Sequence, residues 1–253
     1  MSQPKVLLGI NYYSGKENER AKYLDKFLKS IYKYTTNYPE LDIVIFDDCS
    51  PYKPLCAEKI IVADKPGIRW HRVRNRIYQY FLDHPEYQYL FAYDEDYEVI
   101  TDNWINHIVG CMENIPQIGV LCSHYARLAD AKTYQLQHLP YCFECKNHSY
   151  VCGHLAMLHE NGFQVRTTNW ATGGCWTLRR EIVRLYPDDG SVIYDNGHPG
   201  ADTWNGWDMM SNSSYKLCTT MTDLVFHRGQ EFMVGKFATK YDSEEYKTGK
   251  RLY

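Results

Sequence analysis

The sequence contains no run of the roughly 20 consecutive apolar residues that a membrane-spanning helix needs. The segment Met1–Pro4 leads directly into a strand-like segment, so we expect no secretory signal peptide. Two glycine-rich phosphate-binding patterns, the P-loop and G-x-G-x-x-G, are also missing. These absences argue against a membrane-spanning or secreted protein and against the kinase and dehydrogenase classes. We therefore expect a cytoplasmic protein with no membrane span.

Neither sign of charge dominates the composition. The chain has 28 Lys and Arg residues against 31 Asp and Glu residues, a formal net charge of -3. This balance argues against attraction of the whole surface to nucleic acid or to anionic membranes, and leaves room for a local basic surface. The nine cysteines are odd in number and scattered, which favours reduced thiols. No internal repeat or low-complexity linker interrupts the 253 residues, so we expect one domain.

Strand-like and helix-like segments alternate along the first half of the chain. The predicted strands are Lys5–Ile10, Leu41–Phe46, Lys59–Ala63, Tyr87–Tyr93 and Ile118–Cys122. Helices are predicted around Leu24–Ile31, over Ile68–Leu82 and over Trp104–Met112. This order predicts an α/β fold with a mostly parallel central sheet flanked by helices. Such sheets hold their ligands at the carboxyl ends of the strands.

The second half of the chain is less regular. Residues 124–168 lose the alternation and are rich in His, Cys and Tyr, and residues 187–214 are dense in Gly, Asp and Asn. Between these segments, Gly173-Gly174 is expected to lead into an arginine-rich helix that ends near Leu185. A last strand is predicted over Thr220–Phe226.

Three consecutive acids, Asp94-Glu95-Asp96, directly follow a predicted strand. Mutual repulsion raises the free energy of keeping three neighbouring carboxylates ionised. A contribution to stability is therefore a poor explanation for their presence. A divalent cation removes that repulsion, and hard oxygen ligands suit Mg²⁺ or Mn²⁺. Asp94 and Asp96 are therefore the candidate metal ligands.

A second acidic pair, Asp47-Asp48, follows the second predicted strand. These acids could accept hydrogen bonds from a ribose or a base imide. The other interpretation is a plain turn, since Asp, Ser50 and Pro51 all favour one. Pro66-Gly67 then opens a basic segment, in which we expect one or two side chains to contact a diphosphate, sugar or base; its polar members are Arg69, Arg72, Arg74, Asn75 and Arg76.

Two late residues complete the candidate site. Asp208 follows Trp207 in a loop-like segment, where an acid could serve as a general base beside a sugar. His227 follows an apolar strand, and its imidazole could add a ligand to a metal site. Taken alone, either residue also fits a purely structural role.

The order of these features resembles the GT-A fold glycosyltransferases, especially the family-2 type of inverting enzymes. The resemblance runs from Lys5 to about His227. The motifs that carry it are DDCS at 47–50, G-x6-R-N at 67–75, DED at 94–96, GGC at 173–175, the acid at 208 and HRG at 227–229. It implies a Rossmann-like GT-A domain over 1–253, with a nucleotide-sugar half (1–123), an acceptor-side half (124–228) and a tail (229–253).

The resemblance also implies roles for single residues. Asp47 or Asp48 would bind the nucleotide, most often uridine, and Arg74 and Asn75 would help to hold the donor. Asp94 and Asp96 match the metal and ribose positions of the family's D-x-D motif, His227 matches a metal-binding histidine, and Asp208 matches a catalytic base. The family usually has Glu-Asp or Gln-Asp where this chain has Trp207-Asp208. The implied reaction is an inverting, Mn²⁺- or Mg²⁺-dependent transfer from a UDP-sugar.

A separate group of soft ligands lies at Cys142, Cys145, His148 and Cys152. This inventory could hold a structural Zn²⁺, and buried free thiols are the alternative.

The acceptor is expected to be a saccharide or a glycoconjugate. Two alternatives stay open: a virus-type DNA glycosyltransferase acting on a hydroxylated base, and a carbohydrate-binding module without catalysis. The basic segment and the many aromatics favour modified DNA as an acceptor, whereas the net charge of -3 argues against it.

Overall fold

The computed structural model describes residues 3–14, 19–64, 70–126, 141–142, 147–148, 155–168, 174–185 and 214–227. Three α-helices lie in these ranges: α1 (Glu19–Tyr34), α2 (Trp70–Asp83) and α3 (Trp104–Asn114). The strands of the first half are β1 (Val6–Tyr12), β2 (Leu41–Asp47), β3 (Lys59–Val62), β4 (Tyr89–Asp94), β5 (Tyr97–Val99) and β6 (Ile118–Ala126). Those of the second half are β7 (Tyr141–Cys142), β8 (Asn147–His148), β9 (Met157–Glu160), β10 (Phe163–Thr167), β11 (Cys175–Arg179) and β12 (Lys216–His227).

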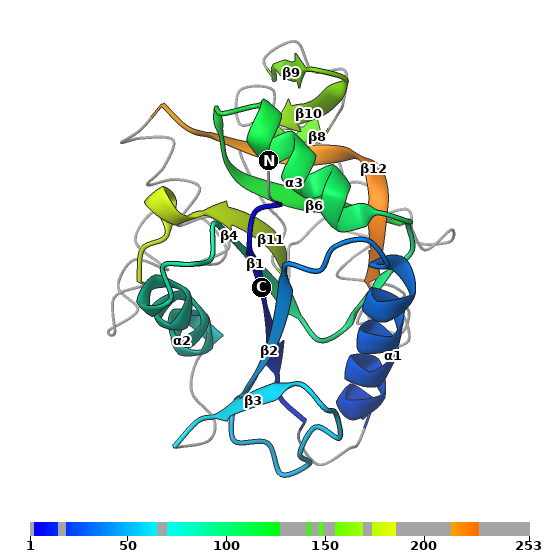
Figure 1. Ribbon diagram of the computed structural model, residues 1–253, viewed down its shortest axis with the longest axis vertical. Coiled ribbons are helices and arrows are strands. Elements are labelled where there is room, and N and C mark those ends of the chain that lie inside the picture. Colours follow the sequence, from blue (N-terminus) through cyan, green and yellow to red (C-terminus); the bar gives the residue numbers. More distant parts are fainter. Residues whose placement is uncertain are drawn as a thin grey trace, which may run out of the picture.

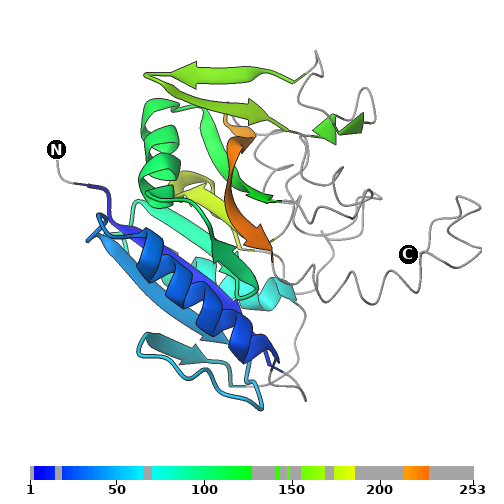
Figure 2. The same ribbon diagram turned by 90° about the vertical axis from the view of Figure 1, so that its right-hand side faces the viewer.

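One large sheet forms the centre of the protein, in the order β3-β2-β1-β4-β11-β6-β12-β10-β9, with β5 paired to β12 (Figure 1). The strands β3, β2, β1 and β4 are parallel to one another, and β6 is parallel to β12. Strand β11 joins these two parallel groups and is antiparallel to β4 and β6. The predicted α/β fold is confirmed, and the sheet ends at β3 on one edge and at the β9–β10 hairpin on the other (Figure 2).

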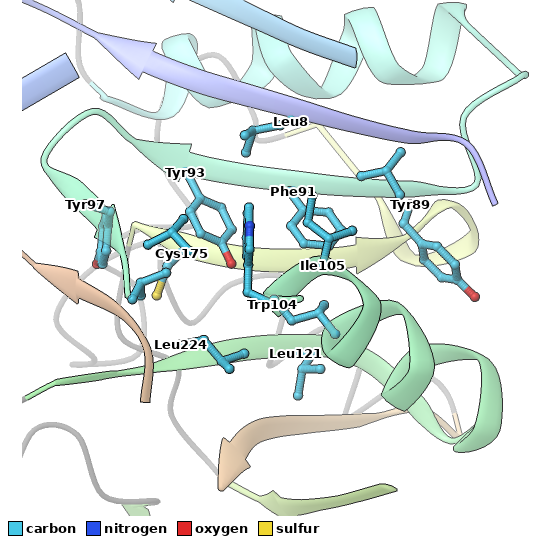
Figure 3. Packing of buried hydrophobic residues seen from close by; sticks show 14 of the residues in the cluster. Leu8, Tyr89, Phe91, Tyr93, Tyr97, Trp104, Ile105, Leu121, Cys175 and Leu224 are labelled. Atoms are coloured by element: carbon cyan, nitrogen blue, oxygen red, sulfur yellow. The ribbon is translucent and has the colours of Figure 1, made fainter. Parts of the chain in front are cut away.

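The helices cover both faces of this sheet. Alternate residues of a strand point to opposite faces, so Leu8 of β1 belongs to the hydrophobic cluster with α1 and α3, whereas Leu7 belongs to the cluster with α2. In the first cluster, the Trp104 ring of α3 lies between two aromatic rings of β4, with centroids 5.6 Å from Phe91 and 5.9 Å from Tyr93 (Figure 3). This packing fixes β4, and with it the acidic turn that follows β4.

The arginine-rich segment is not the helix that the sequence predicts. Residues 175–179 form β11, the strand beside β4, and only Arg180–Ile182 make a single 3-10 turn. The prediction is wrong because residues 175–178 are buried on both faces of the sheet and Arg179 is half-buried, and such a strand shows no alternation of apolar and polar residues. The arginines act elsewhere: the Arg180 guanidinium donates to the carbonyl oxygens of Phe81, Leu82, His84 and Tyr87, at and beyond the end of α2.

The described part of the segment 124–168 is also more regular than predicted. Strands β9 and β10 form an antiparallel hairpin that pairs with β12. Its two-residue turn has positive φ at both positions, 48° at Asn161 and 83° at Gly162. Asn-Gly is the sequence signature of this turn, and that signal was available. The last strand begins at Lys216 rather than Thr220. None of the described helices is long and apolar enough to cross a bilayer.

Candidate active site

The predicted acids meet at the carboxyl edge of the parallel strands. In the register of the sheet, Tyr12 at the end of β1 lies opposite Asp47 of β2. On the other side of β1, Asn11 lies opposite Asp94 of β4. The two acidic motifs therefore flank one strand end, although 47 positions separate them in the sequence numbering (94 minus 47). This edge is where α/β sheets bind their ligands.

The Asp47-Asp48 pair lies in a tight turn. The Asp47 carboxylate is fully buried and accepts a hydrogen bond from the Ser50 backbone N–H at 2.9 Å. Its other oxygen lies 3.2 Å from the Lys53 ammonium. Asp48 pairs with Arg76 of α2 at 2.7 Å. The turn interpretation is thus confirmed, and both acids pair with cations at the strand edge. The nucleotide-binding role of Asp47 or Asp48 stays a prediction.

Asp94 is held from two sides. The same oxygen, Oδ1, accepts hydrogen bonds from Asn11 Nδ2 at 3.2 Å and from Arg74 Nη2 at 3.0 Å. Arg74 is only 3% exposed, and its guanidinium lies 5.5 Å from the Trp176 ring centroid. The sequence placed Arg74 and Asn75 among the donor-binding residues; the structure buries Arg74 against Asp94 and leaves Asn75 half-buried on α2.

Glu95 is the most buried acid of the DED motif, at 3% exposed, and it pairs with Arg20 in the first turn of α1. Burial raises the pKa of the Glu95 carboxyl, and the neighbouring Asp96 carboxylate raises it further, while the Arg20 guanidinium opposes both effects. Sequence reasoning missed Arg20. No local pattern could have revealed it, because 75 positions separate the two partners.

Asn11 and Arg76 each place at this edge a buried polar atom that has no hydrogen-bond partner among the described residues. The two atoms are Asn11 Oδ1, beside Asp94, and Arg76 Nη1, beside Asp48. Buried polar groups in proteins are nearly always paired, with protein, water or ligand. One acceptor and one donor are therefore in place beside the two acidic motifs, and they are the kind of atoms that a bound nucleotide would satisfy.

The acidic turn fits a divalent ion that takes its other ligands from a substrate. Asp94 ends β4, Asp96 is 7% exposed in the turn, and His227 lies opposite Tyr97 in the β5–β12 pairing. Within the described ranges, no group of three His, Cys, Asp or Glu side chains is arranged to hold a metal. Two carboxylates are the usual protein share of a Mg²⁺ or Mn²⁺ site that is completed by phosphate oxygens and water. The residues present fit such an ion.

Several predicted residues lie outside the described ranges. Asp208 is one of them, and so are Cys145 and Cys152 of the Zn²⁺ hypothesis. The backbones of Cys142 and His148 belong to the two-stranded β7–β8 sheet. The catalytic role of Asp208 and the Zn²⁺ site therefore stay predictions.

Gly174 is the close neighbour of the acidic turn. Its carbonyl oxygen accepts the Asp94 N–H at 2.8 Å, and its φ is +99°, a conformation that side chains rarely adopt. A Cβ atom at this position would lie 2.7 Å from Asp94 Oδ2 and 2.8 Å from the Tyr97 hydroxyl. Only glycine leaves room for Asp94 here.

We predict that Gly174→Ala lowers both stability and donor binding. The strained backbone should lower the free energy of unfolding by about 1–3 kcal/mol, and the displaced Asp94 should lower nucleotide affinity at temperatures where the variant is fully folded. Gly162→Ala is the matched control, since φ is +83° and a Cβ atom there meets nothing within 4 Å. Thermal unfolding and nucleotide titration check both. If the two variants bind nucleotide equally well, the contact with Asp94 has no functional weight.

The family follows from the sequence match. Residues 17–186 match the family described as Glycosyl transferase family 2, which is about two thirds of the chain. The chain belongs to glycosyl transferase family 2. The predicted enzyme class, a glycosyltransferase, is thereby confirmed at the level of the family. A search of the curated proteins finds no match.

Solved structures of glycosyltransferases share the fold, which confirms the predicted GT-A fold. TarS residues 1–349 of S. aureus are similar with a TM-score of 0.53 at 13% identity, covering 95% of this chain and 66% of that one. GalNAc-T7, solved with UDP, GalNAc and Mn²⁺, has a TM-score of 0.57 at 14% identity, and the match covers 89% of this chain and 44% of that one. The mannosyltransferase PcManGT of Pyrobaculum calidifontis, in complex with GDP-Man and Mn²⁺, has a TM-score of 0.51 at 16% identity. The match covers 86% of this chain and 57% of that one. The chain thus spans from under half to about two thirds of their lengths.

Proposed function

We propose that this protein transfers a sugar from a nucleotide-diphosphate sugar, with UDP-sugars favoured, to a hydroxyl of a saccharide or glycoconjugate. The observation that carries the proposal is the convergence of Asp47, Asp48, Asp94 and Asp96 at one strand edge. Beside these acids lie the buried acceptor of Asn11 and a buried donor of Arg76. A nucleotide diphosphate with a divalent ion offers the matching groups: hydroxyls for the acceptor, and phosphate oxygens or base carbonyls for the donor.

The ion pairs of the site support a role for its cations in donor binding. Lys53 pairs with Asp47 and Arg76 pairs with Asp48, so both ion pairs lie at the carboxyl edge of the sheet. A diphosphate oxygen would offer Arg76 a second, charged partner, which would accept a hydrogen bond from its Nη1 atom. Arg74, by contrast, is buried against Asp94, so its part in the proposal is to hold that carboxylate in place.

The proposed chemistry is one displacement with inversion at the anomeric carbon. The acceptor oxygen forms its bond to that carbon while the bond to the diphosphate oxygen breaks, and Asp208 takes the proton of the acceptor hydroxyl. A bound Mn²⁺ or Mg²⁺ would neutralise the charge that grows on the leaving diphosphate. The acids at the strand edge contribute by orienting the donor, because a diphosphate is already a good leaving group.

UDP with Mn²⁺ is expected to raise the unfolding temperature of the protein. At a ligand concentration of about 100 times Kd the stabilisation is roughly 2.7 kcal/mol, which corresponds to about 5–10 °C for a chain of this size. EDTA should remove most of the shift, and UMP, which lacks the second phosphate, should give a smaller one.

GDP with Mn²⁺ is the matched arm of this experiment, because GalNAc-T7 was solved with UDP and PcManGT with GDP-Man. A larger shift with GDP would replace uridine by guanosine in the proposal. No shift with any nucleotide and metal would instead favour a carbohydrate-binding module without catalysis.

A further inference from the structure

The acidic turn between β4 and β5 is held by both neighbouring helices. From α2, Arg74 donates to Asp94 at 3.0 Å, and from α1, Arg20 donates to Glu95. Helices α1 and α2 cover opposite faces of the sheet. Two cations from opposite faces therefore pair with two consecutive residues, Asp94 and Glu95. Asp96, the candidate metal ligand, is the next residue of the same turn.

The pair formed by Arg20 and Glu95 differs from an ordinary surface ion pair. The Arg20 side chain is 49% exposed, whereas the Glu95 side chain is 4% exposed. A buried carboxylate without a counter-charge is strongly unfavourable, and two further carboxylates adjoin this one. Removal of Arg20 would therefore leave the buried Glu95 side chain without the partner that holds it, and we expect the turn to shift.

The helix that carries Arg20 is itself firmly attached to the strands on either side of the turn. The Phe27 ring of α1 stacks on Tyr93 of β4, with centroids 6.1 Å apart. Ser30 of α1 accepts the backbone N–H of Val99, at the end of β5, at 2.8 Å. One face of α1 thus contacts the strand before the turn, the turn itself and the strand after it. Helix α1 can therefore hold the acidic turn in one position relative to β4 and β5.

We propose that Arg20 is a positioning residue, which holds the Asp94–Asp96 turn in its metal-binding shape by neutralising and orienting Glu95. The inference rests on the proposed function, since it assigns to Arg20 the support of that metal site. Partners that orient metal ligands without touching the ion commonly change metal affinity by about 10–100-fold when they are removed. Arg20 contacts neither substrate nor metal in this assignment, and Glu95 acts only through the turn.

The test is Mn²⁺ titration of the full chain in the presence of UDP, read by electron paramagnetic resonance. Arg20→Ala should weaken Mn²⁺ binding by about 10-fold or more. Arg20→Lys should recover part of the loss, because the charge remains and the planar fork is lost. The double variant Arg20→Ala/Glu95→Gln should bind Mn²⁺ within about 3-fold of Glu95→Gln alone, because the buried charge is gone in both.

Lys29→Ala provides the matched control on the same helix. It breaks an exposed pair with Asp25, 2.7 Å long, on the solvent side of α1, and should leave Mn²⁺ affinity unchanged. If Arg20→Ala is folded and binds Mn²⁺ as the unmodified chain does, or if it only lowers the unfolding temperature, the positioning role is wrong. If Arg20→Ala does not fold, the double variant decides: Mn²⁺ binding well below that of Glu95→Gln overturns the inference. Failure of the unmodified chain to bind Mn²⁺ with UDP overturns the proposed function as well.

Discussion

Asp96→Ala is expected to abolish metal-dependent nucleotide binding and donor turnover while the fold stays intact. The residue ends the acidic turn, next to Tyr97, and His227 lies opposite Tyr97 on the paired strand. With the carboxylate gone, Asp94 alone remains of the two candidate oxygen ligands, and one carboxylate holds Mg²⁺ or Mn²⁺ poorly. Turnover should fall by at least 100-fold, measured with a UDP-sugar and saturating Mn²⁺.

The control for this experiment is Asp83→Ala, which removes an exposed acid from the far end of α2, where it accepts a hydrogen bond only from Gln79 among the contacts described. That variant should keep full activity. Near-normal activity of Asp96→Ala in the presence of a chelator would show that the metal site is misassigned. Mn²⁺ should serve at least as well as Mg²⁺ if His227 is a ligand, because imidazole suits the softer ion.

Asp208→Asn should lower the rate of the chemical step by about 100-fold or more and leave donor binding nearly unchanged. An amide cannot take up the proton of the acceptor hydroxyl. A rate factor of about 100 or more is what a general base usually contributes. The measurement is single-turnover kinetics at saturating donor, with donor affinity determined separately. The product should have the anomeric configuration opposite to that of the donor, which NMR of the new linkage reads directly.

Asp202→Asn is the matched substitution for this prediction, because it changes another acid of the same glycine-rich segment, six positions earlier (208 minus 202). It should leave the chemical step within a few-fold of the unmodified chain. A product with retained configuration would falsify the single displacement, and equal rates for the two variants would remove Asp208 from the reaction.

The sequence by itself determined the first half of the fold, where the spacing of apolar residues along the chain indicates each strand and helix. The strands around Lys5–Ile10, Leu41–Phe46 and Tyr87–Tyr93 and the helices between them appear where the apolar spacing places them. Because parallel strands expose their carboxyl ends at one edge, the order of the elements also brings Asp47 and Asp94 together. The family motifs then point to a nucleotide sugar.

Only the tertiary structure decided which groups surround those acids. Residues 175–179 form a buried strand rather than a helix because β4 and β6 supply hydrogen bonds on both sides, and no local pattern encodes such partners. Arg74 lies against Asp94 and Arg20 against Glu95 because packing brings distant charges together, where burial makes a partner necessary. Gly174 must be glycine because Asp94 and Tyr97, both far from it in sequence, fill the space that a side chain would need. The periodicity of the sequence determines where the strands end, and the long-range contacts determine which charged groups surround the acids at those ends.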